Sequence, residues 1–270
     1  MSKDSFLFLG SFFLLISLLL FINIIYSYYF NLYLNVNSYI PPLFLSLFFG
    51  TALILIKINE KKISIFNKIL TVVMGYLVFP FIIAIPYFLS IYNISFIDSY
   101  FEAVSGFTST GFTVFDNIKH IDESLIIWRS TSQWIGGLYF LFSIIVLIDI
   151  FDENLKKSLT NFISFNSSEL FKQLFKLIIV YIFLTLLIFI ILKIINFRNF
   201  DSLNFALTII SSGGFKPIND LEYILNTDLK IIIFSLTFLI SFFSIFLSYN
   251  IVFLKNKYLN FFTEDFYLLI

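Results

Sequence analysis

Two short segments of this 270-residue chain combine hydroxyl residues with glycine in an order suited to binding a dehydrated cation. In chain order they are Thr108, Ser109, Thr110, Gly111 and Phe112, and then Ser211, Ser212, Gly213, Gly214 and Phe215. Glycine permits positive φ, so successive carbonyl oxygens can be turned towards one axis. Rings of carbonyls replace the hydration shell of K⁺ in selectivity filters. The carbonyls that we expect to coordinate K⁺ are those of Ser109, Thr110, Gly111, Ser212, Gly213 and Gly214.

The two segments belong to an internal repeat. Asp98 lies 13 residues before Gly111, and Asp201 lies 13 residues before Gly214. Either segment alone would indicate an ordinary turn between two helices, because short motif matches are often coincidental. The two segments share the Asp spacing, the length of the apolar run, the Gly-Phe tip and the flanking apolar stretches. This fourfold agreement favours a filter over a turn.

Each copy predicts a short helix ahead of its hydroxyl segment, over 99–107 and 203–210. At about 1.5 Å per residue, such a helix covers roughly half of an apolar thickness of about 30 Å, so the chain must turn back. Asp98 and Asp201 are predicted as N-caps, where a carboxylate accepts a backbone N–H and meets the positive end of the helix dipole. Irregular backbone at this depth must be buried in protein or line a water-filled cavity.

The composition indicates an integral membrane protein. Hydrophobic residues make up 59% of the chain, the mean hydropathy is +0.96, and only 13% of residues are charged, against about 25% in soluble domains. Six stretches reach the length of about 20 residues that spans a bilayer as helix. They cover residues 6–30, 40–58, 69–91, 125–148, 174–195 and 231–254. The predicted fold is therefore all-α, with about six transmembrane helices and two re-entrant pore loops.

The composition also excludes several kinds of site. The absence of cysteine excludes a disulfide scaffold and a thiolate metal site, and a single histidine leaves no histidine cluster for metal binding or a catalytic triad. Seventeen basic residues balance 17 acidic ones, which gives no support for a nucleic-acid partner.

The positive-inside rule predicts the orientation of the chain in the membrane, since 11 of the 17 basic residues lie on one side. These residues are Lys3, Lys57, Lys61, Lys62, Lys68, Lys156, Lys157, Lys172, Lys176, Lys255 and Lys257. Both termini are then cytoplasmic, and both hydroxyl segments face outward.

Three motifs resemble the membrane subunit of the Trk/Ktr potassium uptake family, the TrkH, TrkG and KtrB kind. The most specific is Trp-Arg-Ser-Thr-Ser-Gln-Trp-Ile-Gly-Gly at 128–137, which is similar to the WR-x-x-x-QW-x-GG signature of that family. The others are Ala-Ile-Pro-Tyr-Phe-Leu-Ser at 84–90 and Phe-Glu-Ala-Val-Ser-Gly at 101–106. The resemblance covers most of the chain after Ile40. It implies that Gly111 and Gly214 are filter glycines of two repeats in a pore built from four.

The resemblance also implies a domain organisation and partners. Residues 1–68 would form a two-helix pre-domain, 69–150 and 151–254 two helix, pore-loop, helix repeats, and 255–270 the lead-in to a third repeat. K⁺ would be the transported ion, with no covalent cofactor and no enzymatic activity, in the cytoplasmic membrane of a bacterium. The implied partners are membrane lipid, the second half of the pore from a downstream chain or a second copy, and a cytosolic nucleotide-binding subunit of the TrkA or KtrA type. That regulatory subunit would approach the basic segment 156–176.

Two repeats form only half of such a pore, so the function has two interpretations. The leading one is K⁺ uptake by half of a Trk/Ktr transporter subunit. The rival is a truncated, non-conducting fragment that serves as a membrane scaffold or is a decay product. The sequence leaves open the choice between K⁺ and Na⁺, since selectivity depends on the field of the assembled ring.

Several polar residues near the segments need their own explanation. Arg129 beside Trp128 is expected to anchor the chain at the headgroup boundary, with a role in holding the pore loop as the alternative. Glu102 must be paired, hydrogen-bonded or in the outer aqueous funnel, because a bare charge in a membrane is costly. Gly136 and Gly137 are expected to allow close approach of helices.

Lys216 departs from the family pattern, which has a small or polar residue directly after the second Gly-Phe. A cation that faces the pore would repel K⁺. Lys216 is therefore expected to turn outward, towards Asp220 or Glu222.

Overall fold

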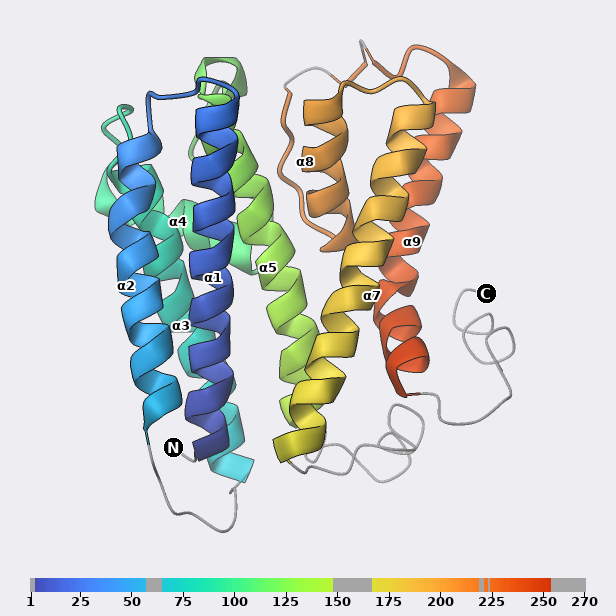
Figure 1. Cartoon of the computed structure of the whole chain (residues 1–270). Coiled ribbons are helices and arrows are strands. Elements are labelled where there is room, and N and C mark those ends of the chain that lie inside the picture. The colour runs from blue at the N-terminus through green and yellow to red at the C-terminus, as the bar shows by residue number, and fades with distance from the viewer. Residues whose placement is uncertain (1–2, 57–64, 148–166, 219–220, 223, 254–270) are drawn as a thin grey trace.

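The computed structural model describes residues 3–56, 65–147, 167–218, 221–222 and 224–253. Within these residues the chain is helical apart from the connections between helices, of which the two longest follow α4 and α8 (Figure 1). The helices are α1 (Lys3–Tyr29), α2 (Val36–Leu55), α3 (Ile65–Phe88), α4 (Phe96–Phe107), the 3-10 turn η1 (Ile118–His120), α5 (Glu123–Leu147), α7 (Ser167–Ile194), α8 (Asn199–Ile210) and α9 (Asp228–Phe253). The predicted all-α class is confirmed.

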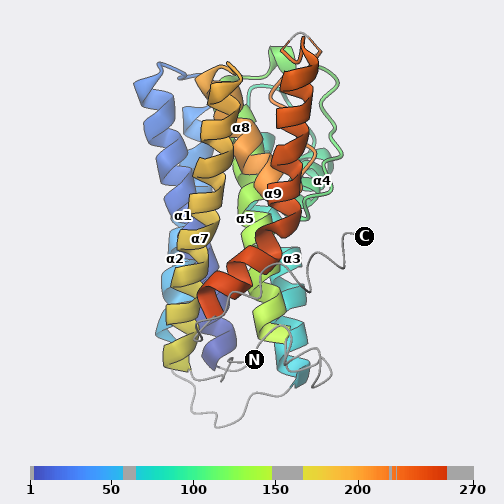
Figure 2. The ribbon, with the colours of Figure 1, turned by 90° about the vertical axis from the view of Figure 1, so that its right-hand side faces the viewer.

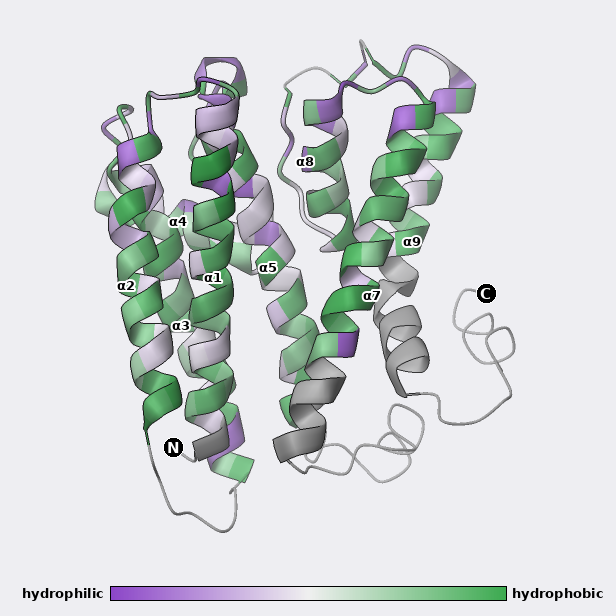
Figure 3. Cartoon of the chain, in the orientation of Figure 1, coloured by the Kyte–Doolittle hydropathy of each residue, from purple (hydrophilic) through white to green (hydrophobic). Residues whose placement is uncertain are grey.

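Four of the described helices are long and apolar enough to cross a membrane, over Ser5–Tyr29, Val36–Leu55, Ile65–Phe88 and Phe175–Ile194. The remaining predicted spans, 125–148 and 231–254, fall on α5 and α9, which contain 25 and 26 residues. Large apolar side chains such as Phe48, Phe183 and Ile190 stay exposed on the flanks of the helices, as lipid contact allows. Polar residues gather at the upper end in Figure 3, around the connecting loops.

Helix α5 lies at the centre of the described fold. It contacts α1, α3 and α4 on one side and α7 and α8 on the other (Figure 1). An aromatic cluster joins the first group, since the ring of Tyr139 on α5 contacts Phe12 of α1, Phe79 of α3 and Phe107 of α4. The two short helices α4 and α8 therefore pack against the same long helix.

The short helices have half the length of their neighbours. Each contains 12 residues, which corresponds to about 18 Å of rise. Figure 1 and Figure 2 show α8 ending about halfway along α7, and the chain after it turns back towards the end where α8 began. The predicted half-length helices are present, and they begin three to four residues earlier than expected.

The predicted N-caps were wrong. The cap of α4 is Ser95, whose Oγ accepts the backbone N–H of Asp98 at 3.1 Å and donates to the Asp98 carboxylate at 2.7 Å. The cap of α8 is Arg198, whose guanidinium donates to both carboxylate oxygens of Asp201 at 2.8 and 3.0 Å. Each aspartate sits at the third helical position, from which a side chain reaches back to the cap while staying near the positive end of the dipole.

Some predictions concern residues outside the described ranges. These include most of the lysines used for orientation, the part of the basic segment before residue 167, the terminal segment 255–270, and Asp220. The predicted domain boundaries near 150 and 254 also fall there. Lys216 itself is described and exposed.

Candidate ion-binding site

Both short helices end in the same turn. Ser109 after α4 and Ser212 after α8 each have a left-handed φ of 55°. At α4, the N–H of Thr110 donates to the carbonyl of Ser105 and the N–H of Ser109 to that of Gly106, both at 2.9 Å. The equivalent bonds at α8, 103 residues later, join Gly213 N to Thr208 O at 2.8 Å and Ser212 N to Ile209 O at 2.9 Å. This is the Schellman arrangement, with serine where glycine is usual.

The tips of the two segments meet. Gly111 has a φ of +82°, and a Cβ added to it would lie 2.6 Å from the Cα of Gly214. A Cβ on Gly214 would lie 3.3 Å from the Cα of Gly111. Two glycines that are 103 residues apart in sequence are thus in contact, and no side chain fits at Gly111.

The first loop, residues 108–114, folds back along its own helix. The Ser105 hydroxyl donates to the Phe112 carbonyl at 2.5 Å. One turn earlier in α4, Glu102 accepts the N–H of Val114 at 3.0 Å and the hydroxyl of Thr113 at 3.1 Å. The side chain of Phe112 is 68% exposed. The backbone of this loop is therefore held by α4 itself.

Arg129 completes the support of the first loop. Its Nε lies 2.7 Å from Glu102 Oε1, and its Nη2 donates to Thr113 Oγ1 at 2.9 Å. Arg129 and Glu102 are 1% and 0% exposed, so the expected interfacial anchor was wrong and the alternative, holding the pore loop, describes the contacts. Trp128 is also buried and donates to the carbonyl of Ile83 at 3.0 Å. A buried charge needs such a partner, and the expectation that Glu102 is paired is confirmed.

The second loop, residues 211–216, depends on other helices. The N–H of Phe215 donates to Gln133 Oε1 on α5 at 3.3 Å, and the guanidinium carbon of Arg129 lies 4.3 Å from the centre of the Phe215 ring. The hydroxyls of Ser212 and Ser241, on α9, are 2.7 Å apart. Residues of α5 therefore contact both loops.

Glycine on α5 receives the ends of both short helices. A Cβ at Gly136 would collide with the carbonyl oxygen of Phe107, the last residue of α4. A Cβ at Gly137 would lie 2.7 Å from the Cβ of Ser211, which caps α8, and 2.6 Å from Tyr181 Oη. The close approach expected at this glycine pair is present, with one glycine for each repeat.

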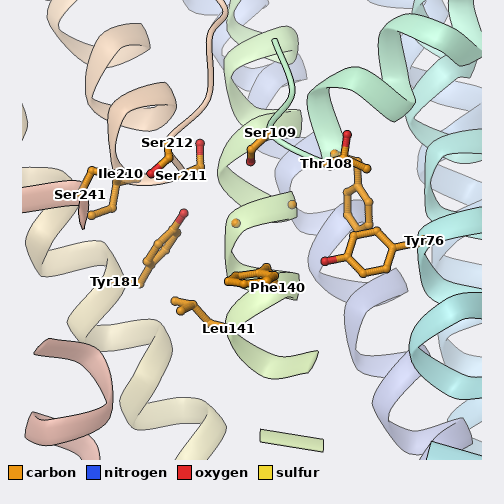
Figure 4. Close-up of a pocket in the computed structure, with 13 residues that line it drawn as sticks. Tyr76, Thr108, Ser109, Phe140, Leu141, Tyr181, Ile210, Ser211, Ser212 and Ser241 are labelled. Atoms are coloured by element: carbon orange, nitrogen blue, oxygen red, sulfur yellow. Dashed lines mark hydrogen bonds between the residues drawn. The ribbon is translucent and has the colours of Figure 1, made fainter. Parts of the chain in front are cut away.

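A cavity of about 290 Å³ lies where the two short helices end (Figure 4). Tyr76 and Tyr181 stand on opposite sides of it, with Phe140 between them. The C-terminal ends of α4 and α8, which carry partial negative charge, meet the cavity at Thr108 and Ser211. Hydroxyl groups that line it come from Tyr76, Thr108, Ser109, Tyr181, Ser211, Ser212 and Ser241.

This arrangement favours a cation. Oxygen atoms from hydroxyls and from backbone carbonyls near the paired tips are ligands of the kind that coordinate alkali cations in filters. Two helix C-termini add a favourable field for positive charge. The sequence interpretation missed Gln133 as a contact of the second loop. A usable signal existed, because Arg129 and Gln133 are two polar residues four apart on one face of a helix in a membrane protein.

Long apolar helices around two half-length helices are the architecture of a multi-pass membrane protein. Residues 40–220 match the family model TrkH, described as a cation transport protein. The chain belongs to the TrkH family of cation transport proteins, whose members are transporters and not enzymes.

One curated relative and one solved structure extend over most of this chain. An uncharacterized cation transporter of Methanocaldococcus jannaschii is 28% identical over 221 residues, which cover 78% of this chain and 44% of that protein. The Trk system potassium uptake protein TrkG of Escherichia coli is 41% identical over 68 residues, 25% of this chain and 14% of TrkG. The crystal structure of the potassium transporter TrkH from Vibrio parahaemolyticus superposes with a TM-score of 0.67 at 21% identity, over 87% of this chain and 49% of that chain. The chain spans less than half the length of each of these proteins.

Proposed function

We propose that this chain takes up K⁺ across the cytoplasmic membrane, as half of a Trk/Ktr-type pore. Its filter carbonyls would be those of Ser109, Thr110, Gly111, Ser212, Gly213 and Gly214. The observation that carries the proposal is the contact between Gly111 and Gly214 at equivalent positions of two loops with the same turn. Six spans and two re-entrant loops would place these tips within the membrane, with both termini on the cytoplasmic side.

The structure supports a path along which an ion would pass without undergoing a chemical reaction. An outward-facing filter would replace the hydration shell by carbonyl oxygens. Beyond it, the hydroxyl-lined cavity of about 290 Å³ offers room for water and the negative ends of α4 and α8. The filter would bind and release the ion without a covalent cofactor.

K⁺ is favoured as the ion by the names of relatives. TrkG and the Halomonas elongata protein TrkI, which is 34% identical over 55 residues, are both named potassium uptake proteins. The partners proposed with this function are lipid, a second pore half from a downstream chain or a second copy, and a nucleotide-binding subunit of the TrkA or KtrA type. The setting proposed is a bacterial cytoplasmic membrane.

The test is complementation. The gene, carried with the DNA that follows it, should restore growth of a potassium-uptake-deficient strain at low K⁺ and drive Rb⁺ uptake. Gly111→Asp should abolish both, since it adds a charged side chain where no Cβ fits. His120→Gln, at an exposed residue, is the matched control.

The abundance of each variant in the membrane is measured alongside. Unchanged growth and Rb⁺ uptake with abundant Gly111→Asp protein would contradict the filter assignment. Failure of the wild type to transport, despite normal abundance, would favour the rival interpretation of a non-conducting scaffold.

A further inference from the structure

We propose that four residues form a brace that positions the second filter loop against the first, with Arg129 at its centre. The brace consists of Glu102 on α4, Arg129 and Gln133 on α5, and Phe215 in the second loop. Its effect on ion selectivity rests on the proposed function. Its effect on the position of the loops does not.

The brace connects the backbone of one loop to the side chain of the other. Glu102 accepts the N–H of Val114 in the first loop at 3.0 Å, and its other carboxylate oxygen lies 2.7 Å from Arg129 Nε. The guanidinium of Arg129 lies in turn over the Phe215 ring, 4.3 Å from its centre. Stacking on an aromatic face suits the planar, delocalised guanidinium. A displacement of the second loop would therefore have to break a buried charge-to-ring contact.

Gln133 fixes the same residue from a second direction. It lies one helical turn after Arg129, is 0% exposed, and accepts the backbone N–H of Phe215 at 3.3 Å. A Cβ at Gly213 would collide with the Gln133 amide, so the glycine makes room for it. Phe215 is thus held at its ring and at its backbone, directly next to Gly214, which touches the tip of the first loop.

The second repeat shows that a short helix can pack against the following long helix without a charged pair. Phe205 lies 103 residues after Glu102, and Phe234 is the sixth residue after the start of α9, as Arg129 is after the start of α5. The Phe205 and Phe234 rings pack edge to face with centres 5.6 Å apart. The short helix can therefore be joined to the following long helix by apolar groups. The charged pair of the first repeat adds a contact with the other loop.

The first experiment measures loop position without transport. Because this chain has no cysteine, Asp116→Cys and Lys216→Cys give one spin-labelled pair per chain, with one label beyond each loop tip. Both positions are exposed and outside the brace. Pulsed electron spin resonance should give a distance distribution that broadens and shifts with Arg129→Gln. It should stay unchanged with Trp128→Phe, a neighbour on α5 that bonds Ile83 instead of a loop.

Phe215→Leu covers the case in which Arg129→Gln does not fold, because it removes the stacked ring without leaving a buried charge. Distributions as narrow as that of the wild type in every folded variant of Arg129 and Phe215 would overturn the proposal. A second readout is the ratio of Rb⁺ to Na⁺ uptake, which should fall about tenfold, equivalent to about 1.4 kcal/mol, at equal membrane abundance. Broadened distributions in Arg129→Gln, together with a wild-type chain that transports no ion, would leave the brace standing and remove the proposed function.

Discussion

In the first repeat, the short helix α4 meets the following long helix α5 through a buried ion pair, whereas in the second, α8 meets α9 through two phenylalanine rings. The ion pair joins Glu102 to Arg129 at 2.7 Å, and the rings of Phe205 and Phe234 cross at 85°. Both short helices nevertheless end in the same hydrogen-bonded turn. The turn therefore depends on the backbone hydrogen bonds at the helix end. The side chains that join the short helix to the long helix can differ between the repeats without changing it.

The two loops also differ in where their support comes from. Glu102 and Ser105 of α4 hold the first loop, so that repeat supplies its own scaffold. The second loop is bonded by Gln133 of α5 and by Ser241 of α9. Changes in the first repeat should therefore disturb the second loop more than changes in the second repeat disturb the first.

The largest expected effect comes from breaking the ion pair on one side. Arg129→Leu should lower the free energy of unfolding by about 3–5 kcal/mol, because Glu102 would stay buried without its partner. The matched change in the second repeat, Phe234→Leu, should cost less than about 1.5 kcal/mol, because it keeps an apolar group of similar size. Thermal or denaturant unfolding of the detergent-solubilised protein measures both.

The double variant Glu102→Leu with Arg129→Leu sharpens this comparison. It should recover part of the loss, since no charge is left buried and the pair then resembles the apolar contact of the second repeat. A double variant less stable than Arg129→Leu would show that the two repeats do not tolerate the same kind of contact.

The next largest loss of stability is expected where the end of α4 packs against α5. Gly136→Ala should cost about 1–3 kcal/mol through overpacking, because its Cβ would collide with the carbonyl oxygen of Phe107. The counterpart on α9 is Ser241, the 13th residue after the start of its helix, as Gly136 is on α5. Ser241→Ala should cost only about 1 kcal/mol, the value of one hydrogen bond. Equal losses in unfolding experiments would contradict the inferred close contact at Gly136.

The repeat itself was predictable from local spacing, and its supports were not. The distance from Asp98 to Gly111 indicated a half-length helix with a glycine tip, and both features are present. Local rules misplaced the helix start, because Ser95 and Asp98 are both good caps and form one reciprocal pair. Arginine is not a preferred N-cap residue, so nothing in the sequence indicated that Arg198 caps α8.

Contacts between residues far apart in sequence are the second feature that could not be predicted. Arg129 lies 27 residues from Glu102, and Gln133 lies 82 residues from Phe215, so no local pattern identifies these partners. The charge of Arg129 within a membrane helix did indicate a partner inside the protein, and the interpretation of Arg129 as an interfacial anchor overlooked this. The left-handed turn was expected at glycine, but the structure also places Ser109 and Ser212 there because the helix-end bonds outweigh the preference for glycine.

A smaller effect distinguishes the two tip glycines. Gly111→Ala should lose about 1–2 kcal/mol, since its φ of +82° is unfavourable for a residue with a Cβ and the Cα of Gly214 blocks the space. Gly214→Ala should lose less, because its Cβ would lie 3.3 Å from the nearest atom. Unfolding midpoints and Rb⁺ uptake should both rank Gly111→Ala below Gly214→Ala. The reverse order would mean that the second tip, and not the first, limits the approach of the loops.

The smallest effect separates the two serines of the helix-end turns. Ser109→Gly should raise the free energy of unfolding by about 0.5 kcal/mol, because relief of the left-handed strain slightly exceeds the added flexibility of the unfolded chain. Ser212→Gly gains the same relief but loses the hydroxyl contact with Ser241, so its net change should be zero or negative. Unfolding midpoints of the two variants and of Ser241→Ala test this. An equal gain in both serine variants would show that the Ser212–Ser241 contact contributes nothing to holding the second loop.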